Sequence, residues 1–255
     1  MKVFVLANQK GGVGKSTTAT TLAAILRQEQ REVLFIDADP QGNSTDTYKA
    51  KITEVATLYD VLLDDERIPL KEAVQVVEAG DIIASDPLLT KADSILLNDV
   101  EGIYRLQDAI KELTDYDYVV IDTAPTMNSL LHSCLIAADR VIIPVTADRY
   151  AIQGLFQLND TIQAVQRRQN PRLRVSGLLL TKYAERRLLD KEVRETLKKT
   201  AEELHTRLFA TTIRESIKAK ESQAVRLALM EYAPYCTTAL DYRNFVAELI
   251  KDEEN

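Results

Sequence analysis

The residue types best suited to chemistry are concentrated in one short stretch near the N-terminus, which reads NQKGGVGKST over residues 8–17. An apolar run at 3–7 precedes it, and a helical pattern begins near Lys15. Glycines let backbone N–H groups turn inward around an anion, and a helix start adds N–H donors and partial positive charge. A strand, a glycine turn, a Lys-Ser pair and a helix in this order predict a phosphate-binding loop for a nucleotide.

The residue types in this loop predict how each would contact the nucleotide and its metal ion. The Lys15 ammonium would reach the β- and γ-phosphates, and the Ser16 hydroxyl would bind Mg²⁺. An ordinary phosphate loop has no need of Lys10, because Lys15 already serves the phosphates. From this stretch alone, the residues expected to contact the nucleotide are Gly11, Gly12, Val13, Gly14, Lys15, Ser16 and Thr17.

Three aspartates follow apolar runs further along the chain. Asp37 and Asp39 come at the end of the run 32–37, and Asp122 closes the run 117–122. The carboxyl ends of strands line the ligand crevice in a doubly wound sheet, so these carboxylates are expected to converge near the phosphate loop. Asp122 is expected to hold Mg²⁺ through water. Asp37 and Asp39 occupy alternate positions, and both are expected to face the site only if the strand has already ended.

Short apolar runs alternate with longer helical patterns along the sequence. The expected strands are at 3–7, 32–37, 81–85, 117–122, 140–145 and 174–181. The expected helices are at 16–29, 101–113, 126–137, 151–169, 188–205, 219–230 and 238–251. The runs are continuous, as in strands that are covered on both faces. This alternation predicts an α/β fold with a mostly parallel sheet between helices and, without a linker or repeat, a single domain over residues 1–255.

Composition and charge exclude several classes of protein. The content of 45% hydrophobic and 28% charged residues is that of a globular chain, and 6% aromatic residues argue against a stacking platform for single-stranded nucleic acid. No stretch approaches the roughly 20 apolar residues of a membrane span, and the apolar run at 3–7 is too short for a signal peptide. Cys134 and Cys236 have no metal-ligand spacing. A cytoplasmic protein is therefore expected.

The motif Lys-Gly-Gly-Val-Gly-Lys-Ser-Thr, which begins at Lys10, resembles the deviant Walker A box of the ParA/MinD family. The resemblance implies a doubly wound P-loop NTPase fold, with ATP and Mg²⁺ as cofactors. It also implies that Lys10 crosses a dimer interface to contact the nucleotide of the partner subunit. The segment DADPQGN, from Asp37, is similar to the family's second box, which implies that Asp39 orients the attacking water. Asp37 would then lie nearer the water shell of the metal.

The resemblance covers nearly the whole chain. Residues 139–155, 177–183, 213–224 and 241–249 are similar to blocks of the ParA/Soj partition ATPases. It implies an ATP-bound homodimer that binds nonspecific double-stranded DNA in the nucleoid, and a ParB-like centromere-binding protein that stimulates hydrolysis. No arginine finger is evident, so slow intrinsic hydrolysis is expected, and residues 122–129 are expected to sense the γ-phosphate.

The charge distribution accommodates a DNA partner although the net charge is −7. Residues 161–226 hold 16 of the 32 Lys and Arg but only 8 of the 39 Asp and Glu, a local balance of +8. A nonspecific binder needs such a basic surface, because phosphate contacts supply its affinity. The resemblance places DNA contacts at Arg186 and Lys218. It also shows a departure, because Ile-Arg-Glu at residues 213–215 stands where the family has Ile-Pro-Arg near the adenine.

Several alternatives stay open at this point. A membrane-cycling relative of the MinD type would need a basic amphipathic C-terminal helix, whereas the tail ends in acidic residues and Phe245, Leu249 and Ile250 are expected to pack on the domain. The nitrogenase iron protein would need cysteines in glycine-rich turns, and Cys134 lies in a helical pattern. A ParA-like ATPase that positions a non-DNA cargo, and an ATP-dependent metabolic ligase of the same superfamily, are the remaining candidates.

Overall fold

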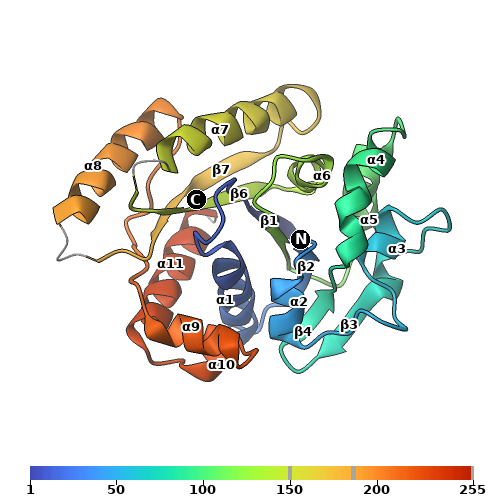
Figure 1. The fold of residues 1–255 in the computed structure, drawn as a ribbon, viewed down its shortest axis with the longest axis horizontal. Helices are drawn as coiled ribbons and strands as arrows, with labels where there is room; N and C mark the ends of the chain where they lie inside the picture. The colour runs from blue at the N-terminus through green and yellow to red at the C-terminus, as the bar shows by residue number, and fades with distance from the viewer. Residues whose placement is uncertain (149–150, 185–187, 254–255) are drawn as a thin grey trace.

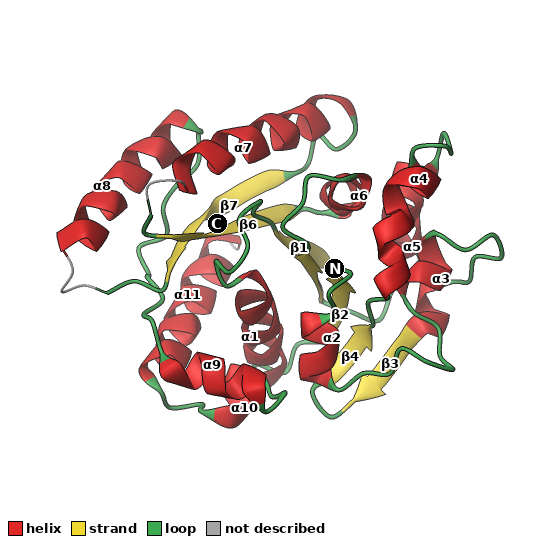
Figure 2. Ribbon diagram, in the orientation of Figure 1, coloured by secondary structure: helices red, strands yellow, loops and turns green. Residues whose placement is uncertain are grey.

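The computed structural model describes residues 1–148, 151–184 and 188–253. The strands of this part form one sheet in the order β3-β4-β2-β5-β1-β6-β7 (Figures 1 and 2). Their bounds are β1 Lys2–Leu6, β2 Val33–Ala38, β3 Val74–Val77, β4 Gly80–Ile83, β5 Tyr118–Thr123, β6 Arg140–Thr146 and β7 Arg174–Thr181. All neighbouring pairs are parallel except β3 with β4, which confirms the predicted doubly wound, mostly parallel α/β sheet.

Helices cover both faces of this sheet (Figure 2). The α-helices are α1 Lys15–Gln28, α2 Asn43–Tyr48, α3 Leu58–Leu62, α4 Ala92–Leu96, α5 Arg105–Lys111, α6 Ser129–Ala137, α7 Ala151–Arg168, α8 Leu188–Glu203, α9 Ile217–Ala224, α10 Leu229–Tyr232 and α11 Thr237–Glu253. Short 3₁₀ turns are η1 Leu70–Ala73, η2 Pro87–Lys91 and η3 Gly102–Tyr104. The helices α1 and α11 lie on one face, and α6 and α7 lie on the other.

The central strands explain why their sequences are continuously apolar. Successive side chains of a strand point to opposite faces, so in β2 Leu34 and Ile36 pack against the helices of one face. Val33 and Phe35 pack against those of the other face. Both faces are buried, so no position of the strand is left for a polar residue until Asp37. Polar side chains therefore follow these apolar runs only at the edge of the sheet where the strands end.

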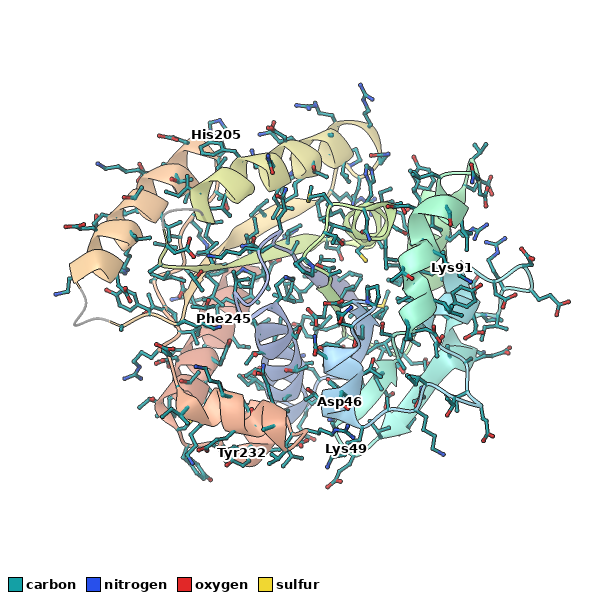
Figure 3. All side chains as sticks on the ribbon, viewed as in Figure 1. Asp46, Lys49, Lys91, His205, Tyr232 and Phe245 are labelled. Atoms are coloured by element: carbon teal, nitrogen blue, oxygen red, sulfur yellow. The ribbon has the colours of Figure 1, made fainter. Side chains whose placement is uncertain are left out.

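The C-terminal helix α11 completes one of the two cores. Phe245 and Leu249 are fully buried against the face that α1 also covers, and Ile250 packs beside them (Figure 3). This packing agrees with the expectation that the apolar residues of the tail contact the domain. Within the described residues, no helix is long and apolar enough to cross a membrane.

The structure differs from the predicted elements where segments are short or partly exposed. Strand β3 was not predicted, because it lies at the sheet edge with Val76 81% exposed, and its pairing with β4 defines it. The helices α2, α3 and α4 were also missed, since each is too short to show a helical period. The helix expected at 219–230 is divided into α9 and α10, with Arg226 between them at a φ of 55°.

Candidate nucleotide-binding site

The loop between β1 and α1 is shaped by glycines at specific positions. Gly12 and Gly14 have φ angles of 72° and 89°, in the left-handed region that side chains with a Cβ disfavour. Gly14 stands directly before the first residue of α1. A Cβ on Gly11 or Gly12 would meet no atom within 4 Å, so the backbone conformation, not crowding, requires glycine at Gly12. The loop therefore leaves an open cradle in front of the helix start.

Polar contacts fix the beginning of this loop. The side-chain amide of Asn8 donates to the Pro144 carbonyl at 2.7 Å, and its oxygen accepts from the Lys10 N–H at 2.9 Å. The Lys15 ammonium donates to the Lys10 carbonyl at 3.4 Å. The Lys10 ammonium forms an ion pair with Asp148, just after β6. Lys15 thus lies inside the loop, whereas Lys10 points away to a partner in the same chain.

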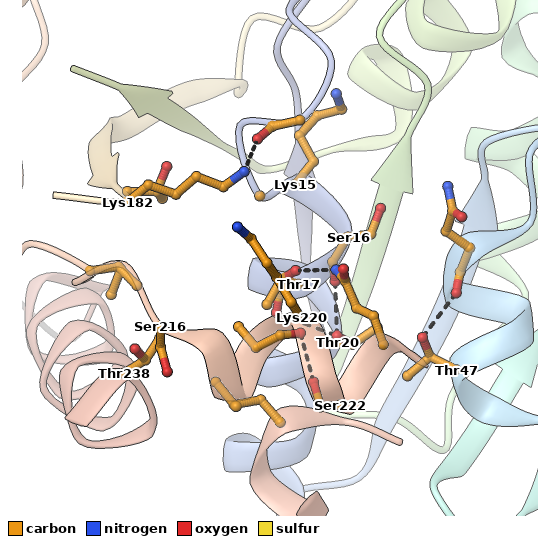
Figure 4. Close-up of a pocket in the computed structure, with 18 of the residues that line it drawn as sticks. Lys15, Ser16, Thr17, Thr20, Thr47, Lys182, Ser216, Lys220, Ser222 and Thr238 are labelled. Atoms are coloured by element: carbon orange, nitrogen blue, oxygen red, sulfur yellow. Dashed lines mark hydrogen bonds between the residues drawn. The ribbon is translucent and has the colours of Figure 1, made fainter. Parts of the chain in front are cut away.

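A cavity of about 440 Å³ opens in front of the loop. Figure 4 shows that Lys15, Ser16 and Thr17 of α1 border it on one side, and Lys220 of α9 on another. Asp39 also lines it. Ligand pockets of this size, with a few convergent polar groups, are typical of small-molecule and cofactor sites. The cavity, the glycine cradle and the helix start together suit an anionic ligand such as a nucleotide phosphate chain.

Two aspartates meet beneath this cavity. Asp37 of β2 and Asp122 of β5 are register partners on neighbouring parallel strands, and both are fully buried. Asp37 accepts hydrogen bonds from the Thr45 N–H at 2.7 Å, the Thr45 hydroxyl at 2.8 Å and the Asp39 N–H at 3.1 Å. Burial and, to a smaller extent, the neighbouring Asp122 charge raise the pKa of Asp37 to about 7, although its hydrogen bonds oppose the shift.

Asp122 is the better metal candidate of the two. Its Oδ2 accepts a hydrogen bond from the Ser44 hydroxyl at 2.8 Å, whereas its Oδ1 is buried without a hydrogen-bond partner in the described residues. Burial is the main reason that the pKa of Asp122 is raised to about 6, and the Ser16 and Ser44 hydroxyls, which approach this carboxylate, oppose the shift. A buried carboxylate oxygen without a partner, near the Ser16 hydroxyl that lines the cavity, fits a Mg²⁺ held with its waters. No cluster of three or more His, Cys, Asp or Glu ligands occurs among the described residues, so phosphate oxygens and water would complete the coordination.

Asp39 and Lys15 occupy the cavity side of the site. Strand β2 ends at Ala38, so Asp39 leaves the strand and lines the cavity while Asp37 stays beneath it. The Asp39 carboxylate accepts from the Gln41 N–H at 3.0 Å, which fixes the turn. Burial lowers the pKa of Lys15, and the charges of Asp122 and Asp39 oppose that shift. The two carboxylates therefore help to keep the ammonium charged close to where a phosphate would bind.

Comparison with known proteins identifies the family. Residues 1–175 match the AAA domain family model. The chain is 38% identical over 201 residues to the chromosome partitioning protein ParA of Myxococcus xanthus, covering 77% of this chain and 70% of that protein. It is 33% identical to the sporulation initiation inhibitor protein Soj of Bacillus subtilis, covering 97% of this chain and 98% of Soj. The chain belongs to the ParA/Soj family of P-loop ATPases.

Solved structures of ParA-like fold agree with this assignment. A plasmid partition protein of Borrelia burgdorferi bound to AMPPNP has a TM-score of 0.83 and 27% identity, and the match covers 99% of both chains. Cobyrinic acid a,c-diamide synthase of Mycobacterium smegmatis, with an ATP analogue and magnesium, has a TM-score of 0.87 and 29% identity, over 100% of this chain and 96% of the other. Nucleotide and magnesium binding are thus properties of this fold family, and this member is a ParA-like ATPase.

The ParA-type site contains residues that sequence reasoning did not assign. Ser44 and Thr45 at the start of α2 bind the two buried carboxylates, and Thr181 and Lys182 reach the phosphate loop from the end of β7. The position of Thr181 and Lys182 at a strand's carboxyl end was an available signal, because such ends line the crevice. For α2 the sequence carried no comparable signal, because the helix is only six residues long.

The segment that departs from the ParA/Soj pattern is held by α11. The Arg214 guanidinium forms an ion pair with Asp241 at 2.6 Å, and the Arg214 N–H donates to the same carboxylate at 3.0 Å. The Thr238 hydroxyl donates to the Arg214 carbonyl at 3.0 Å. Proline at this position would lack the N–H donor. Ile213, Arg214 and Glu215 all line the cavity, so the replaced segment still borders the candidate nucleotide site.

Of the two predicted DNA contacts, Lys218 lies among the described residues. Arg186 lies outside the described residues. Lys218, in the first turn of α9, is half exposed, forms an ion pair with Glu221 at 2.8 Å and lies 5.7 Å from the ring centre of Tyr232. The Glu221 partner raises the pKa of Lys218, so its ammonium remains charged at neutral pH. Lys218 is accessible to a phosphate, although Glu221 competes for it.

Proposed function

We propose that this chain, a single ATPase domain, is a Mg²⁺-dependent switch that dimerises around two ATP molecules and binds nonspecific double-stranded DNA in that state. The observation that carries the proposal is the arrangement of Lys15 and Asp39 on one cavity with the buried Asp37–Asp122 pair next to them, in a chain that matches Soj over nearly its whole length. Slow hydrolysis of ATP to ADP and phosphate would return the dimer to the unbound state.

Each residue of the site has a proposed role in hydrolysis. Loop N–H groups and Lys15 would bind the phosphates, while Ser16 and Asp122 would hold Mg²⁺, with Asp37 supporting its water shell. When bound, Mg²⁺ neutralises developing negative charge on the phosphates. Asp39 would orient the attacking water from its position on the cavity wall. A carboxylate beside anionic phosphate is a poor proton acceptor, which supports a slow intrinsic rate.

The position of Lys10 supports the dimer. Its ammonium is bound to Asp148 in the single chain, and its side chain remains 38% exposed. Exchange of this surface ion pair for a phosphate of the partner subunit would cost little, because exposed ion pairs contribute only about 0–1 kcal/mol. ATP binding and dimerisation would then occur together, since Lys10 has its strong anionic target only when the second subunit carries a triphosphate.

The basic segment supports a DNA surface. Its exposed Lys and Arg side chains include Lys191, Lys198 and Lys199 on α8 and Lys218 and Lys220 on α9. In Figure 1, α8 lies at the upper left and α9 at the bottom, and the two helices pack against opposite faces of the sheet, so these lysines form two basic patches. Contacts to phosphates need no base recognition, so such a surface suits binding without sequence preference. The name of the ParA relative supports a partition role. In that role a ParB-like partner would accelerate hydrolysis.

A gel mobility assay on random-sequence duplex DNA tests this proposal. With ATP and Mg²⁺ the protein should retard the DNA, and with ADP or no nucleotide it should not. The Asp39→Ala variant should bind ATP, hydrolyse it at least tenfold more slowly and prolong retention. Unchanged turnover in Asp39→Ala would remove this residue from the catalytic role.

Charge reversal separates the DNA surface from the ATP switch. The Arg186→Glu, Lys218→Glu double variant should lose salt-sensitive retention while keeping ATP-dependent dimerisation, measured by sedimentation. The matched control is Lys71→Glu, because Lys71 is exposed on η1 and outside the basic segment. Full retention by the double variant would show that these positions do not contact DNA.

A metabolic ligase is the competing candidate, favoured by the similarity to cobyrinic acid a,c-diamide synthase over the whole chain. Such an enzyme would use ATP to drive a reaction of a second substrate and would not need DNA. If the rate of ATP hydrolysis is unaffected by DNA, and the protein does not retard DNA with any nucleotide, the result would favour this alternative or a cargo other than DNA.

A further inference from the structure

The end of strand β7 binds the phosphate loop through two consecutive residues. The Thr181 hydroxyl donates to the Val13 carbonyl at 2.7 Å. The Lys182 ammonium donates to the Gly12 carbonyl at 2.6 Å, the contact marked by the dashed line at Lys182 in Figure 4. Two neighbouring carbonyls of the loop are therefore held by two neighbouring side chains, which lie 168 or more positions away in the sequence.

The base of this contact is rigid. Thr181 is 2% exposed, is the last residue of β7 and pairs in register with Thr146 of β6. Its hydroxyl also lies 3.0 Å from the Val145 carbonyl, so it is enclosed between the sheet and the loop. Lys182 follows with a φ of 54°, in the left-handed region that residues other than glycine seldom adopt. The chain turns sharply at the strand end, and the Lys182 side chain lines the cavity beside the loop.

Because of peptide geometry, the hydrogen bonds to the Gly12 and Val13 carbonyls also orient the N–H groups of the residues that follow. In a trans peptide unit the carbonyl and the N–H of the next residue point in opposite directions. The described residues contain no cis peptide bond. A fixed Gly12 carbonyl therefore fixes the direction of the Val13 N–H, and a fixed Val13 carbonyl fixes that of the Gly14 N–H. These N–H groups point away from Thr181 and Lys182 and are the groups that a phosphate loop offers to its anion.

We propose that Thr181 and Lys182 are positioning residues that hold the phosphate loop in its anion-binding conformation before a nucleotide arrives. They act through the Gly12 and Val13 carbonyls and not by touching the nucleotide. The inference rests on the proposed nucleotide site and adds to it a second anchor, at the opposite end of the loop from the Asn8 contacts. A loop without this anchor would have to be ordered by the nucleotide, and the ordering would weaken affinity.

Calorimetric titration of the full chain with ADP and with ATP, each with Mg²⁺, tests the proposal. Lys182→Met and Thr181→Val keep the size of each side chain but remove the donor, and each should weaken binding about tenfold. The loss should be equal for ADP and ATP, because the loop holds both. The double variant should lose much less than the product of the single losses, since the two residues fix one loop conformation. Lys182→Arg should recover most of the affinity, and Lys71→Met is the exposed control.

The outcomes separate this inference from the proposed function. ADP affinity in both single variants equal to that of the unmodified protein would overturn the positioning role while leaving the site intact. A loss confined to ATP would also overturn it, because it would make Lys182 a direct ligand of the γ-phosphate. Absence of ADP binding by the unmodified protein would instead contradict the nucleotide site itself. Thermal unfolding without nucleotide should be the same for Lys182→Met and the control, which excludes a general loss of stability as the cause.

Discussion

At the scale of single residues, the site depends on carboxylates that are costly to ionise without a cation. Asp37 and Asp122 are register partners in a buried region, and burial raises their pKa values to about 7 and about 6. Their hydrogen bonds from Ser44 and Thr45 oppose this effect only in part. The Lys15 ammonium favours the ionised form of Asp122, and a bound divalent cation would add to this effect.

This pair predicts the pH dependence of stability of the metal-free protein. Both pKa values are higher in the folded state than the ordinary value of 3.8, so the folded state binds more protons between about pH 4 and 7. The free energy of unfolding should therefore fall as pH rises through this window. Asp122→Asn removes one of the coupled charges and should raise the free energy of unfolding at pH 7 by about 2 kcal/mol.

Urea unfolding at pH 5, 6, 7 and 8 without Mg²⁺ measures this prediction. The slope of stability against pH should be smaller in Asp122→Asn than in the unmodified protein. The exposed Asp108→Asn variant on α5 is the control and should leave the slope unchanged. A slope that is the same in both variants would mean that the buried pair is ionised at little cost.

Lys15 is the residue on which phosphate binding should depend most. Its ammonium lies inside the loop and lines the cavity, and its charge is favoured by Asp122 and Asp39. Lys15→Ala should therefore weaken ATP binding by at least a hundredfold, as expected for loss of a buried charge-assisted contact. Calorimetric titration measures the affinity, and unfolding in urea checks that the variant is folded. Nearly unchanged ATP affinity would contradict the assignment of the phosphate loop.

At the scale of elements, strand ends and helix starts set the positions of the site. Helix α2 begins where β2 ends, and its first turn donates to the carboxylates of β2 and β5. Helix α9 faces it across the cavity, and the turn after α9 is linked to α2 at the surface by the Arg226–Asp46 ion pair at 3.0 Å. The loop before α9 is in turn fixed to α11 through Arg214 and Asp241. The cavity walls thus belong to separate elements that are joined by ion pairs and hydrogen bonds.

The Arg214–Asp241 contact predicts that a substitution at Arg214 lowers the stability of the protein. Asp241 is buried, whereas the Arg214 side chain is about half exposed. Arg214→Ala should lower the free energy of unfolding by about 1–2 kcal/mol, because it leaves a buried carboxylate with fewer donors. Urea unfolding measures this, and Asp241→Asn in the Arg214→Ala background should recover part of the loss. The control is Lys220→Ala, whose ion pair with Glu215 is long, at 3.9 Å. Equal stability of Arg214→Ala and the control would show that this contact does not hold the segment.

At the scale of the whole molecule, the central question is which anion Lys10 binds. In the single chain it is Asp148, and in the proposed dimer it is a phosphate of the other subunit. The two states compete for one ammonium. The equilibrium between monomer and dimer should therefore respond to changes at either Lys10 or Asp148.

Sedimentation with ATP in the Asp39→Ala background tests this competition. Lys10→Ala should remain near the monomer mass of 28.6 kDa while its ATP affinity changes no more than about threefold, because Lys15 still binds the phosphates. Asp148→Asn releases Lys10 and should increase the dimer fraction. A stable dimer of Lys10→Ala would show that no lysine is exchanged between subunits.

The features that could be predicted from the sequence are those that follow from local pattern. The glycine turn between a strand and a helix located the phosphate loop, and the continuously apolar runs predicted a sheet covered on both faces. Aspartates after such runs were expected at one edge, and the structure brings Asp37 and Asp122 into register there. The reason is physical, because burial of both faces confines polar side chains to the strand ends, and parallel strands end at the same edge.

The residues that contact the loop from far along the chain are apparent only in the folded structure. Thr181 and Lys182 are adjacent to the loop because β7 lies beside β6 and β6 beside β1, an order that no local pattern specifies. Strand β3 exists through its pairing with β4, and α2 through hydrogen bonds to carboxylates on two strands. Such contacts depend on sheet order and register, which are set by packing over the whole chain, and short segments carry too few residues to encode them alone.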